Sequence, residues 1–182
     1  MVTKPIPILE TDRLILRCPS AEDFPAWAEF AADEETQRYI GGVQPPPVAW
    51  RSLCSTTGAW LIRGFSMFSV IERDTGRWIG RVGPLQPEGW PGTEVGWGLI
   101  REVWGRGYAT ESAQACLDYA FEVLGWAEAI HTIDSDNLAS QNVARRLGSS
   151  ILRRSFLPEP FADKEVDVWG QTRAQWLARR AA

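Results

Sequence analysis

Two glycines between a strand-like segment and a helix-like segment form the first candidate site. Residues 93–100 alternate as a strand does, Gly105 and Gly107 follow in a tight turn, and apolar residues then recur at helical spacing. This arrangement points several backbone N–H groups, and the positive end of the helix dipole, at one spot. We therefore expect a phosphate or pyrophosphate group to bind here without a lysine.

The residues that follow the glycines exclude two common phosphate-binding motifs. A P-loop would continue with Lys and Ser/Thr, but Tyr108 and Ala109 follow Gly107. A dinucleotide-binding turn would have a third glycine where Thr110 stands, and it would lie in the first strand–helix unit. The turn in this chain lies past its middle.

A carboxylate lies on the strand that leads into this turn. Alternate residues of a strand share a face, so Glu94, Gly96 and Gly98 point the same way. Two missing side chains predict a shallow groove with Glu94 at its far end, where a ligand can approach the backbone closely. The alternative is that the glycines only relieve packing and that Glu94 is solvated.

The positions of these groups depend on the elements around them. We expect strands at 13–17, 65–72, 77–85, 93–100, 129–133, 151–157 and 165–171. We expect helices from the capping box at Ser20 and Asp23 to Ala32, at 48–62, from the glycine turn to Gly125, and from Ser140 to Leu147. This order predicts an α/β (α+β) domain with a mixed sheet.

The composition is that of an ordinary globular protein. The 182 residues predict a single domain over residues 1–182, with 45% hydrophobic and 23% charged residues. A net charge of −4 gives no basic surface, so nucleic acid is not an expected partner. The sequence shows neither a signal peptide nor an apolar stretch of membrane length, and we expect a cytoplasmic protein that does not bind membranes.

The cysteines and the single histidine do not suggest a metal or nucleophile site. Cys18, Cys54 and Cys116 are far apart and odd in number, which argues against a disulfide framework or a zinc site. Cys116 falls on the apolar face of a predicted helix. His131 lies in an alternating segment, and a hydrogen-bonded strand histidine is more expected there than a catalytic one.

Four segments, in order along nearly the whole chain, resemble one enzyme family. Residues 104–111 (WGRGYATE) resemble the acyl-CoA loop of the GCN5-related N-acetyltransferases, and more narrowly of the branch that acetylates the N-termini of ribosomal proteins. Residues 136–148 resemble the family's Asn-x-x-Ser segment, and residues 10–17 and 172–176 its first strand and its Thr-Arg-x-x-Trp tail. The resemblance implies a mostly antiparallel mixed sheet flanked by helices.

The resemblance also implies acetyl-CoA as co-substrate, with no metal, in a cleft between strand 93–100 and the next strand. Its pyrophosphate would bind the N–H groups of residues 104–110, and its pantetheine arm the backbone of residues 99–101, where one N–H would stabilise an oxyanion. The residues implied in acetyl-CoA binding are Leu99, Ile100, Arg101, Trp104, Gly105, Arg106, Gly107, Tyr108, Ala109, Thr110, Asn137 and Asn142.

In this family an amine attacks the thioester directly, which leaves two proton transfers to the protein. Glu94 is the candidate base, acting directly or through a water. The tyrosine that serves many members as acid corresponds to Ala144 here. Ser140 could replace it, although helix capping is an alternative role for Ser140, and a thiol leaving group does not strictly need an acid.

Other departures from the family pattern affect the surroundings of the site. Arg101 stands where proline is usual and Ser149 where phenylalanine is common. Arg106, Arg145 and Arg146 could reach the phosphates of CoA or could be solvated.

Two classes of function remain open from the sequence. The first is acetyl transfer to a primary amine, such as a protein N-terminus or a small molecule; the second is a catalytically silent acyl-CoA-binding or interaction domain. A nucleotide-binding domain is a third, weaker alternative. Acceptor specificity is expected from Trp27, Tyr39, Trp50 and the segment 86–92. Ten tryptophans are many, and we expect most in the core and some at a groove or a homodimer interface.

Overall fold

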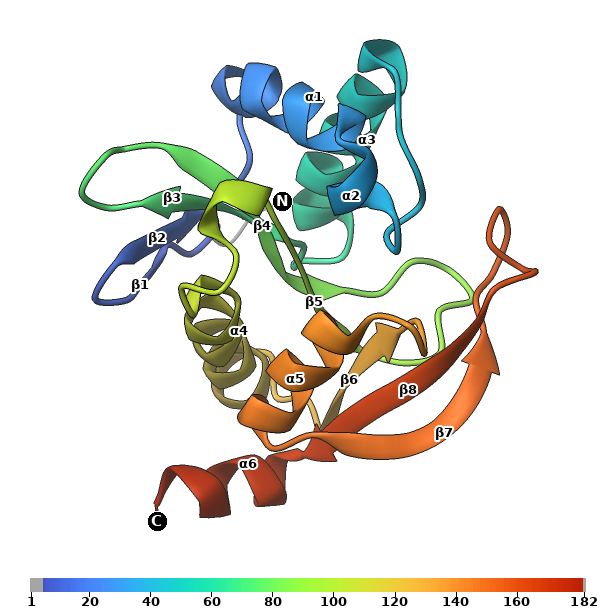
Figure 1. Cartoon of the computed structure of the whole chain (residues 1–182). Coiled ribbons are helices and arrows are strands. Elements are labelled where there is room, and N and C mark those ends of the chain that lie inside the picture. Colours follow the sequence, from blue (N-terminus) through green and yellow to red (C-terminus); the bar gives the residue numbers. More distant parts are fainter. Residues whose placement is uncertain (1–4, 182) are drawn as a thin grey trace.

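The computed structural model describes residues 5–181 (Figure 1). The strands are β1 (Leu9–Glu10), β2 (Leu14–Arg17), β3 (Phe68–Glu72), β4 (Trp78–Leu85), β5 (Glu94–Leu99), β6 (Glu128–Ile133), β7 (Ser150–Phe156) and β8 (Glu165–Thr172). The α-helices are α1 (Phe24–Ala32), α2 (Glu34–Gln37), α3 (Pro46–Ile62), α4 (Tyr108–Asp118), α5 (Leu138–Leu147) and α6 (Arg173–Arg180).

The strands form one sheet in the order β1-β2-β3-β4-β5-β6-β8-β7. Every neighbouring pair is antiparallel except β5 and β6, which run parallel. The expected α/β fold, with a mostly antiparallel mixed sheet flanked by helices, is confirmed. The parallel pair at the centre divides the sheet into an N-terminal part and a C-terminal part.

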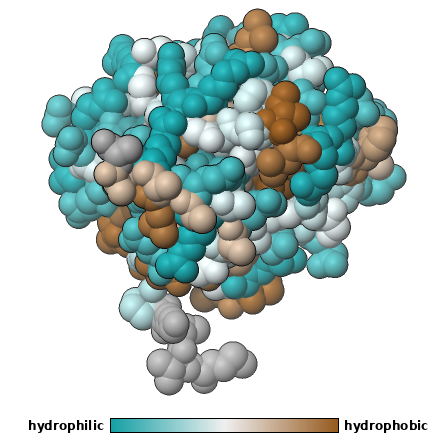
Figure 2. Space-filling view, turned by 90° about the horizontal axis from the view of Figure 1, so that it is seen from below, coloured by the Kyte–Doolittle hydropathy of each residue, from teal (hydrophilic) through white to brown (hydrophobic). Residues whose placement is uncertain are grey.

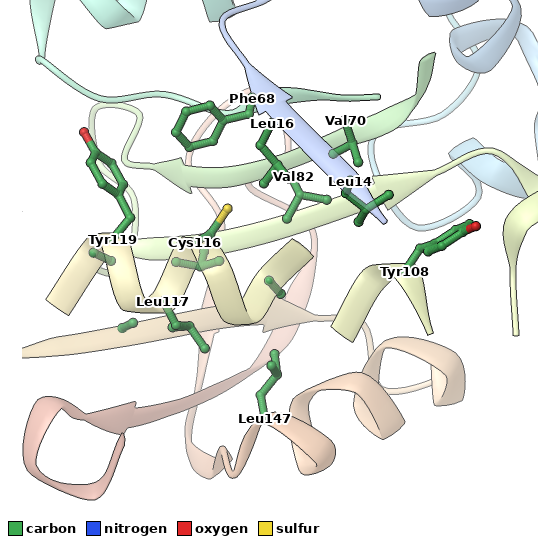
Figure 3. Close-up of a cluster of buried hydrophobic side chains, with 14 of the residues drawn as sticks. Leu14, Leu16, Phe68, Val70, Val82, Tyr108, Cys116, Leu117, Tyr119 and Leu147 are labelled. Atoms are coloured by element: carbon green, nitrogen blue, oxygen red, sulfur yellow. The ribbon is translucent and has the colours of Figure 1, made fainter. Parts of the chain in front are cut away.

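Helices cover both faces of the sheet because its strands are apolar on both sides. On one face, alternate strand residues such as Leu14, Leu16 and Val82 pack against α4. Figure 3 shows Cys116 of α4 pointing toward these strands, while Leu117 points toward Leu147 of α5. On the other face a separate core forms around α1 and α3 (Figure 1). Cys116 is buried in the first of these cores, between the sheet and α4, as its place on the helix predicts.

Helix α5 begins earlier than the sequence suggests. Its N-cap is Asn137, whose Oδ1 accepts a hydrogen bond from the Ser140 N–H at 3.1 Å. Ser140 therefore lies in the first turn of the helix and is not its cap, so the predicted start at Ser140 is wrong. Asparagine and serine cap helices about equally well, and only the backbone decides between them.

Several elements were not expected from the sequence. Residues Tyr119–Val123 continue α4 as a π-helical turn, and the short β1 and α2 precede it in the chain. Helix α6 begins with a capping box between Thr172 and Gln175. It holds Trp176 in the core, where Nε1 donates to the Asp118 carboxylate at 2.8 Å.

Most of the tryptophans lie in the core, as expected. Six of the ten tryptophans are buried (Trp27, Trp60, Trp78, Trp126, Trp169 and Trp176), whereas Trp50 and Trp104 are exposed. The face in Figure 2 is mainly hydrophilic, interrupted by separate apolar areas. Between residues 5 and 181, none of the helices has the length and apolar composition needed to cross a bilayer. The same residues contain no cluster of three or more His, Cys, Asp or Glu side chains placed to hold a metal.

Candidate active site

The site lies where β5 and β6 separate. Glu94 and Ile130 are the pair in register between the two strands, and the Ile130 N–H donates to the Thr93 carbonyl at 2.9 Å. Beyond this pair the ladder stops, although β5 continues to Leu99. A parallel pair that separates after one bridge leaves backbone groups and side chains of both strands facing a cleft.

His131 fills the narrow end of this cleft. One ring nitrogen, Nδ1, lies 2.7 Å from the Val95 carbonyl, and the other, Nε2, lies 3.0 Å from the Ser149 hydroxyl. Because a carbonyl only accepts, Nδ1 carries the proton, and Nε2 accepts from Ser149. The Ser149 oxygen in turn accepts from the Gln171 amide at 3.0 Å.

This environment makes His131 a structural residue. Burial lowers its pKa to about 4, so the ring is neutral near pH 7. The structure thus places it as the hydrogen-bonded strand histidine that the sequence predicts. It also explains Ser149, which replaces the usual phenylalanine, because its hydroxyl pairs with a buried ring nitrogen.

Replacing His131 with leucine is expected to destabilise the fold without removing catalysis. The Val95 carbonyl and the Ser149 hydroxyl would lose their partner, so the free energy of unfolding should fall by about 1–3 kcal/mol. The rate of transfer should stay within about threefold. Denaturant unfolding and steady-state rates measure the two effects. A large loss of rate at unchanged stability would instead identify a catalytic histidine.

A cavity of about 460 Å³ lies at the N-terminus of α4. Gly105 and Gly107 have φ of +75° and +84°, a conformation that glycine adopts without strain. The first intrahelical hydrogen bond runs from the Glu111 N–H to the Gly107 carbonyl at 3.0 Å. The N–H groups of residues 108–110 precede it and have no intrahelical acceptor, so they are open to an anion.

Not all N–H groups of the predicted loop are available. Those of Trp104 and Arg106 donate to the carbonyls of Arg101 and Val103 at 3.0 and 3.4 Å. We expected the N–H groups of the whole stretch 104–110 to be free for a pyrophosphate. The N–H groups of Trp104 and Arg106 are excluded, because each already has a backbone acceptor. Only the structure shows this, because the Arg101–Val103 stretch forms a 3-10 turn that leads into the loop.

The N-terminal strand fixes the position of this loop. The Glu111 carboxylate accepts from the Thr11 hydroxyl at 2.6 Å and from Arg13 Nε at 2.6 Å. Arg13 also donates to the Arg106 carbonyl at 3.0 Å, and its guanidinium lies 4.3 Å from the centre of the Tyr108 ring. These contacts tie residues that are almost 100 positions apart, and sequence spacing alone does not suggest them.

One face of α5, together with its N-cap, forms another wall of this cavity. Asn137, Ser140, Asn142 and Arg146 line it. Arg145 instead donates to the Asn142 side chain at 3.0 Å and lies over the Trp169 ring. Of the two paired arginines, Arg146 is therefore the one placed to meet a ligand.

Two residues whose backbone was predicted to bind the pantetheine arm, Ile100 and Arg101, are not among the residues that line this cavity. The Ile100 N–H donates to the Ile79 carbonyl at 3.0 Å, and Arg101 forms an ion pair with Asp33 at 2.7 Å. Leu99 does line the cavity, but its carbonyl accepts from Trp104 Nε1 at 2.8 Å. Because hydrogen bonds alternate along a strand, the groups of β5 that face the cleft belong to Val95, Trp97 and Leu99.

A second cavity of about 270 Å³ contains Glu94. The carboxylate is buried, with 6% of the residue exposed. Its Oε2 accepts from Trp90 Nε1 at 2.6 Å and from the Thr132 hydroxyl at 2.8 Å, and Oε1 accepts from the Thr132 N–H at 3.2 Å. Burial raises the pKa of Glu94 to about 7, although the hydrogen bonds from Trp90 and Thr132 oppose this rise. A carboxyl group with this pKa can give and take protons at neutral pH.

The predicted groove beside Glu94 is only partly open. Gly96 and Gly98 line the cavity with Glu94, as the alternation predicts. A Cβ on Gly96 would lie 3.4 Å from the free side of Glu94 Oε1. A Cβ on Gly98 would lie 3.0 Å from Phe30 and 3.2 Å from Ile40, so packing from α1 and the following loop fills that end.

The predicted specificity residues divide between this site and the core. Tyr39 lines both cavities, and Pro87 and Trp90 of the segment 86–92 line the one with Glu94. Trp27 is buried and Trp50 packs edge-on against Phe24, and neither residue lines a cavity. The sequence does not single out Trp90 or Thr132 as the groups that hold Glu94, because their proximity depends on strand pairing.

The two cavities meet in the middle of the cleft. Six residues line both of them: Tyr39, Ile40, Trp97, Gly98, Asn137 and Ser140. Trp97 Nε1 donates to the Ser140 hydroxyl across the cleft at 3.2 Å. Ala144, at the family's acid position, is fully buried near Ile133 and Trp169 and faces neither cavity. A helix terminus with open N–H groups and a buried carboxyl group thus lie in two adjoining cavities that share these six residues.

Proteins similar to this chain are acetyltransferases. Residues 13–150 match the family model described as the Acetyltransferase (GNAT) domain. The uncharacterized N-acetyltransferase YoaA of Bacillus subtilis (strain 168) is 31% identical over 146 residues, which is 78% of this chain and 82% of YoaA. The crystal structure of an acetyltransferase from Agrobacterium tumefaciens str. C58 has a TM-score of 0.82 and 30% identity, covering 94% of this chain and 97% of that chain.

The fold also resembles that of an enzyme from the branch that acetylates ribosomal proteins, which the sequence suggested. The ribosomal-protein-S5-alanine acetyltransferase of Vibrio fischeri has a TM-score of 0.73 over 93% of this chain and 98% of that chain. Its identity of 16% makes this a likeness of fold alone. The family-model match and the 31% identity to YoaA carry the assignment: the chain belongs to the GNAT acetyltransferase domain family, and it is an acetyl-CoA-dependent N-acetyltransferase.

Proposed function

We propose that this enzyme transfers an acetyl group from acetyl-CoA to a primary amine by direct attack on the thioester, with Glu94 as the base. The observation that carries the proposal is the meeting of two different cavities at Trp97, Gly98 and Ser140. One has open backbone N–H groups at a helix N-terminus, and the other has a carboxyl group with a pKa near 7.

Acetyl-CoA would occupy the cavity at α4. The N–H groups of Tyr108, Ala109 and Thr110 would hold its pyrophosphate, with Arg146 in reach of a phosphate. The acyl end would then lie along β5, where the N–H groups of Trp97 and Leu99 face the cleft and could stabilise negative charge on the carbonyl oxygen. Leu99 lies within residues 99–101, where the oxyanion N–H was expected, whereas the Ile100 N–H is already bonded to the Ile79 carbonyl.

The amine would enter through the cavity that contains Glu94. Three donors hold this carboxyl group, and Oε1 keeps capacity for a further hydrogen bond from the substrate or a water. Since burial places its pKa near 7, Glu94 is a strong enough base for an ammonium and is still partly ionised at neutral pH.

Ser140 is the proposed donor to the departing thiolate. Its hydroxyl lines both cavities and already accepts from Trp97, so its own proton can point elsewhere. Replacing Ser140 with alanine is expected to lower kcat about tenfold while the dissociation constant of acetyl-CoA stays within about twofold. Single-turnover rates and calorimetry separate the two quantities. An unchanged kcat would mean that the thiolate leaves without an acid.

The acceptor is a protein N-terminus or a small-molecule amine, and the enzyme is proposed to act in the cytoplasm, where a homodimer is the proposed form. The first test is a calorimetric titration with acetyl-CoA, with ATP and NAD alongside, followed by thiol release with a panel of amines and N-terminal peptides. Selective acetyl-CoA binding with thiol release supports the proposal. Binding without transfer to any amine would favour the catalytically silent alternative, and no binding would contradict both.

A further inference from the structure

Arg81 is a cation in the wall of the Glu94 cavity that has no acidic partner. It lies on β4 opposite Gly98 of β5, on the sheet face that carries Glu94 and Gly96. Among residues 5–181 its guanidinium forms no ion pair, and its one side-chain hydrogen bond is a long contact of 3.8 Å to the Met67 sulfur. A thioether is a weak acceptor, so nearly all of the five N–H donors of this arginine are unused.

The surroundings hold this guanidinium in place at some energetic cost. It lies 5.4 Å from the centre of the Trp27 ring and 6.0 Å from that of Phe30. Burial lowers the pKa of Arg81 to about 10, which reflects the cost of keeping a charge away from water. Aromatic faces offset part of this cost but use none of the planar N–H groups. A carboxylate could accept two parallel hydrogen bonds from them.

The other charges on the cavity wall leave this role to Arg81. Glu94 and Asp134 are the acids, and Lys164 is the second cation. Asp134 already accepts from the Asp136 N–H at 2.9 Å. Lys164 lies in the connection between β7 and β8, with its ammonium 5.6 Å from the Phe161 ring centre, and not on the strand that faces β5. The cavity therefore offers a base at one end of the β5 face and an unpaired guanidinium at the other.

We propose that the amine acceptor is a molecule of amino-acid size that carries a carboxylate, and that Arg81 binds this carboxylate. The proposal rests on the proposed function, because it places the amine beside Glu94. Glu94 and Gly98, which lies opposite Arg81, are four residues apart, or about 13 Å at about 3.3 Å per residue. The two long side chains span much of that distance, which leaves room for a short zwitterion. A cavity of about 270 Å³ suits a ligand of that size.

The test compares N-acetyl amino acids, as products, with their amides. With the enzyme saturated with CoA, N-acetyl glycine, leucine, methionine and phenylalanine are each titrated beside the matching carboxamide. The products have no titrating amine, so only the carboxylate differs within a pair. At least one acid should bind about 10- to 100-fold more tightly than its amide, as expected for a charge-assisted pair.

Arg81→Met keeps most of the length of the side chain against Trp27 and removes the charge. It should bring acid and amide to within about threefold of each other, with the affinity for the amide unchanged. Lys164→Met is the matched control and should keep the preference for the acid. Thermal unfolding and the affinity for CoA check that each variant folds.

Three results would overturn the inference: equal binding of acid and amide by the wild-type enzyme, equal weakening of both by Arg81→Met, or no binding of any acid at millimolar concentration. A preference lost in Lys164→Met and kept in Arg81→Met would overturn it too. A transfer assay with amino acids, amino acid amides and peptides separates the two proposals. Transfer to amides and peptides without preference for a carboxylate contradicts the inference alone, and transfer to no amine contradicts the proposed function.

Discussion

Replacing Glu94 with glutamine is expected to lower kcat/KM for the amine by about 100- to 10,000-fold at pH 7. Glutamine keeps nearly the same shape beside Trp90 and Thr132 but cannot take a proton from an ammonium group. The dissociation constant of acetyl-CoA should change by less than about twofold, because that ligand is proposed to occupy the other cavity. Steady-state rates and calorimetry measure the two effects.

The pH dependence of kcat/KM tests the role of Glu94 as a base in a second, independent way. The base acts only when ionised, and burial raises the pKa of Glu94 to about 7. The wild-type kcat/KM should therefore fall as the pH drops below about 7. The kcat/KM of the Glu94→Gln variant should show no bend near pH 7 and should instead rise steadily toward the pKa of the amine. Its deficit should shrink there, because unprotonated substrate no longer needs a base. A parallel deficit at every pH would remove Glu94 from the proton transfer.

Replacing Ala109 with proline is expected to weaken acetyl-CoA binding about 10- to 100-fold. Ala109 is the second residue of α4. This position tolerates proline, and Pro25 and Pro47 occupy the same position in α1 and α3. The change therefore removes one N–H of the open set at the start of α4 while the helix can still form. The lost donor is one that would face the pyrophosphate.

The control for Ala109→Pro is a shorter ligand and not another variant. S-acetylpantetheine has the thioester arm but no pyrophosphate, so its dissociation constant should be the same in the variant and the wild type. Weaker binding of both ligands would mean that the helix start had moved, which thermal unfolding would also detect. Unchanged binding of both would place the pyrophosphate elsewhere.

The sequence by itself determines most of the elements and indicates a phosphate-bearing ligand. Apolar periodicity locates α3, the β3–β4 hairpin and α4, because a buried face needs apolar residues at the period of its own backbone. Gly105 and Gly107 indicate the phosphate turn because a positive φ strongly favours glycine. Alternation along β5 also predicts that Glu94 shares a face with Gly96, and a Cβ on Gly96 would indeed lie 3.4 Å from Glu94 Oε1.

Only the tertiary structure decided which of these groups have partners. Glu94 gains its raised pKa from burial against β6, and its contact with Thr132 depends on a register set by a single strand pair. The Ile100 N–H cannot bind a ligand because it donates to the Ile79 carbonyl of β4. Arg81 is one arginine among many in the sequence, and its lack of an acid within residues 5–181 follows from which side chains the sheet brings beside it. The periodicity of apolar residues depends on the repeat of the local backbone and can be read from the sequence. The hydrogen-bond partners, the burial and the pKa of each group depend on contacts between segments that are distant in the sequence.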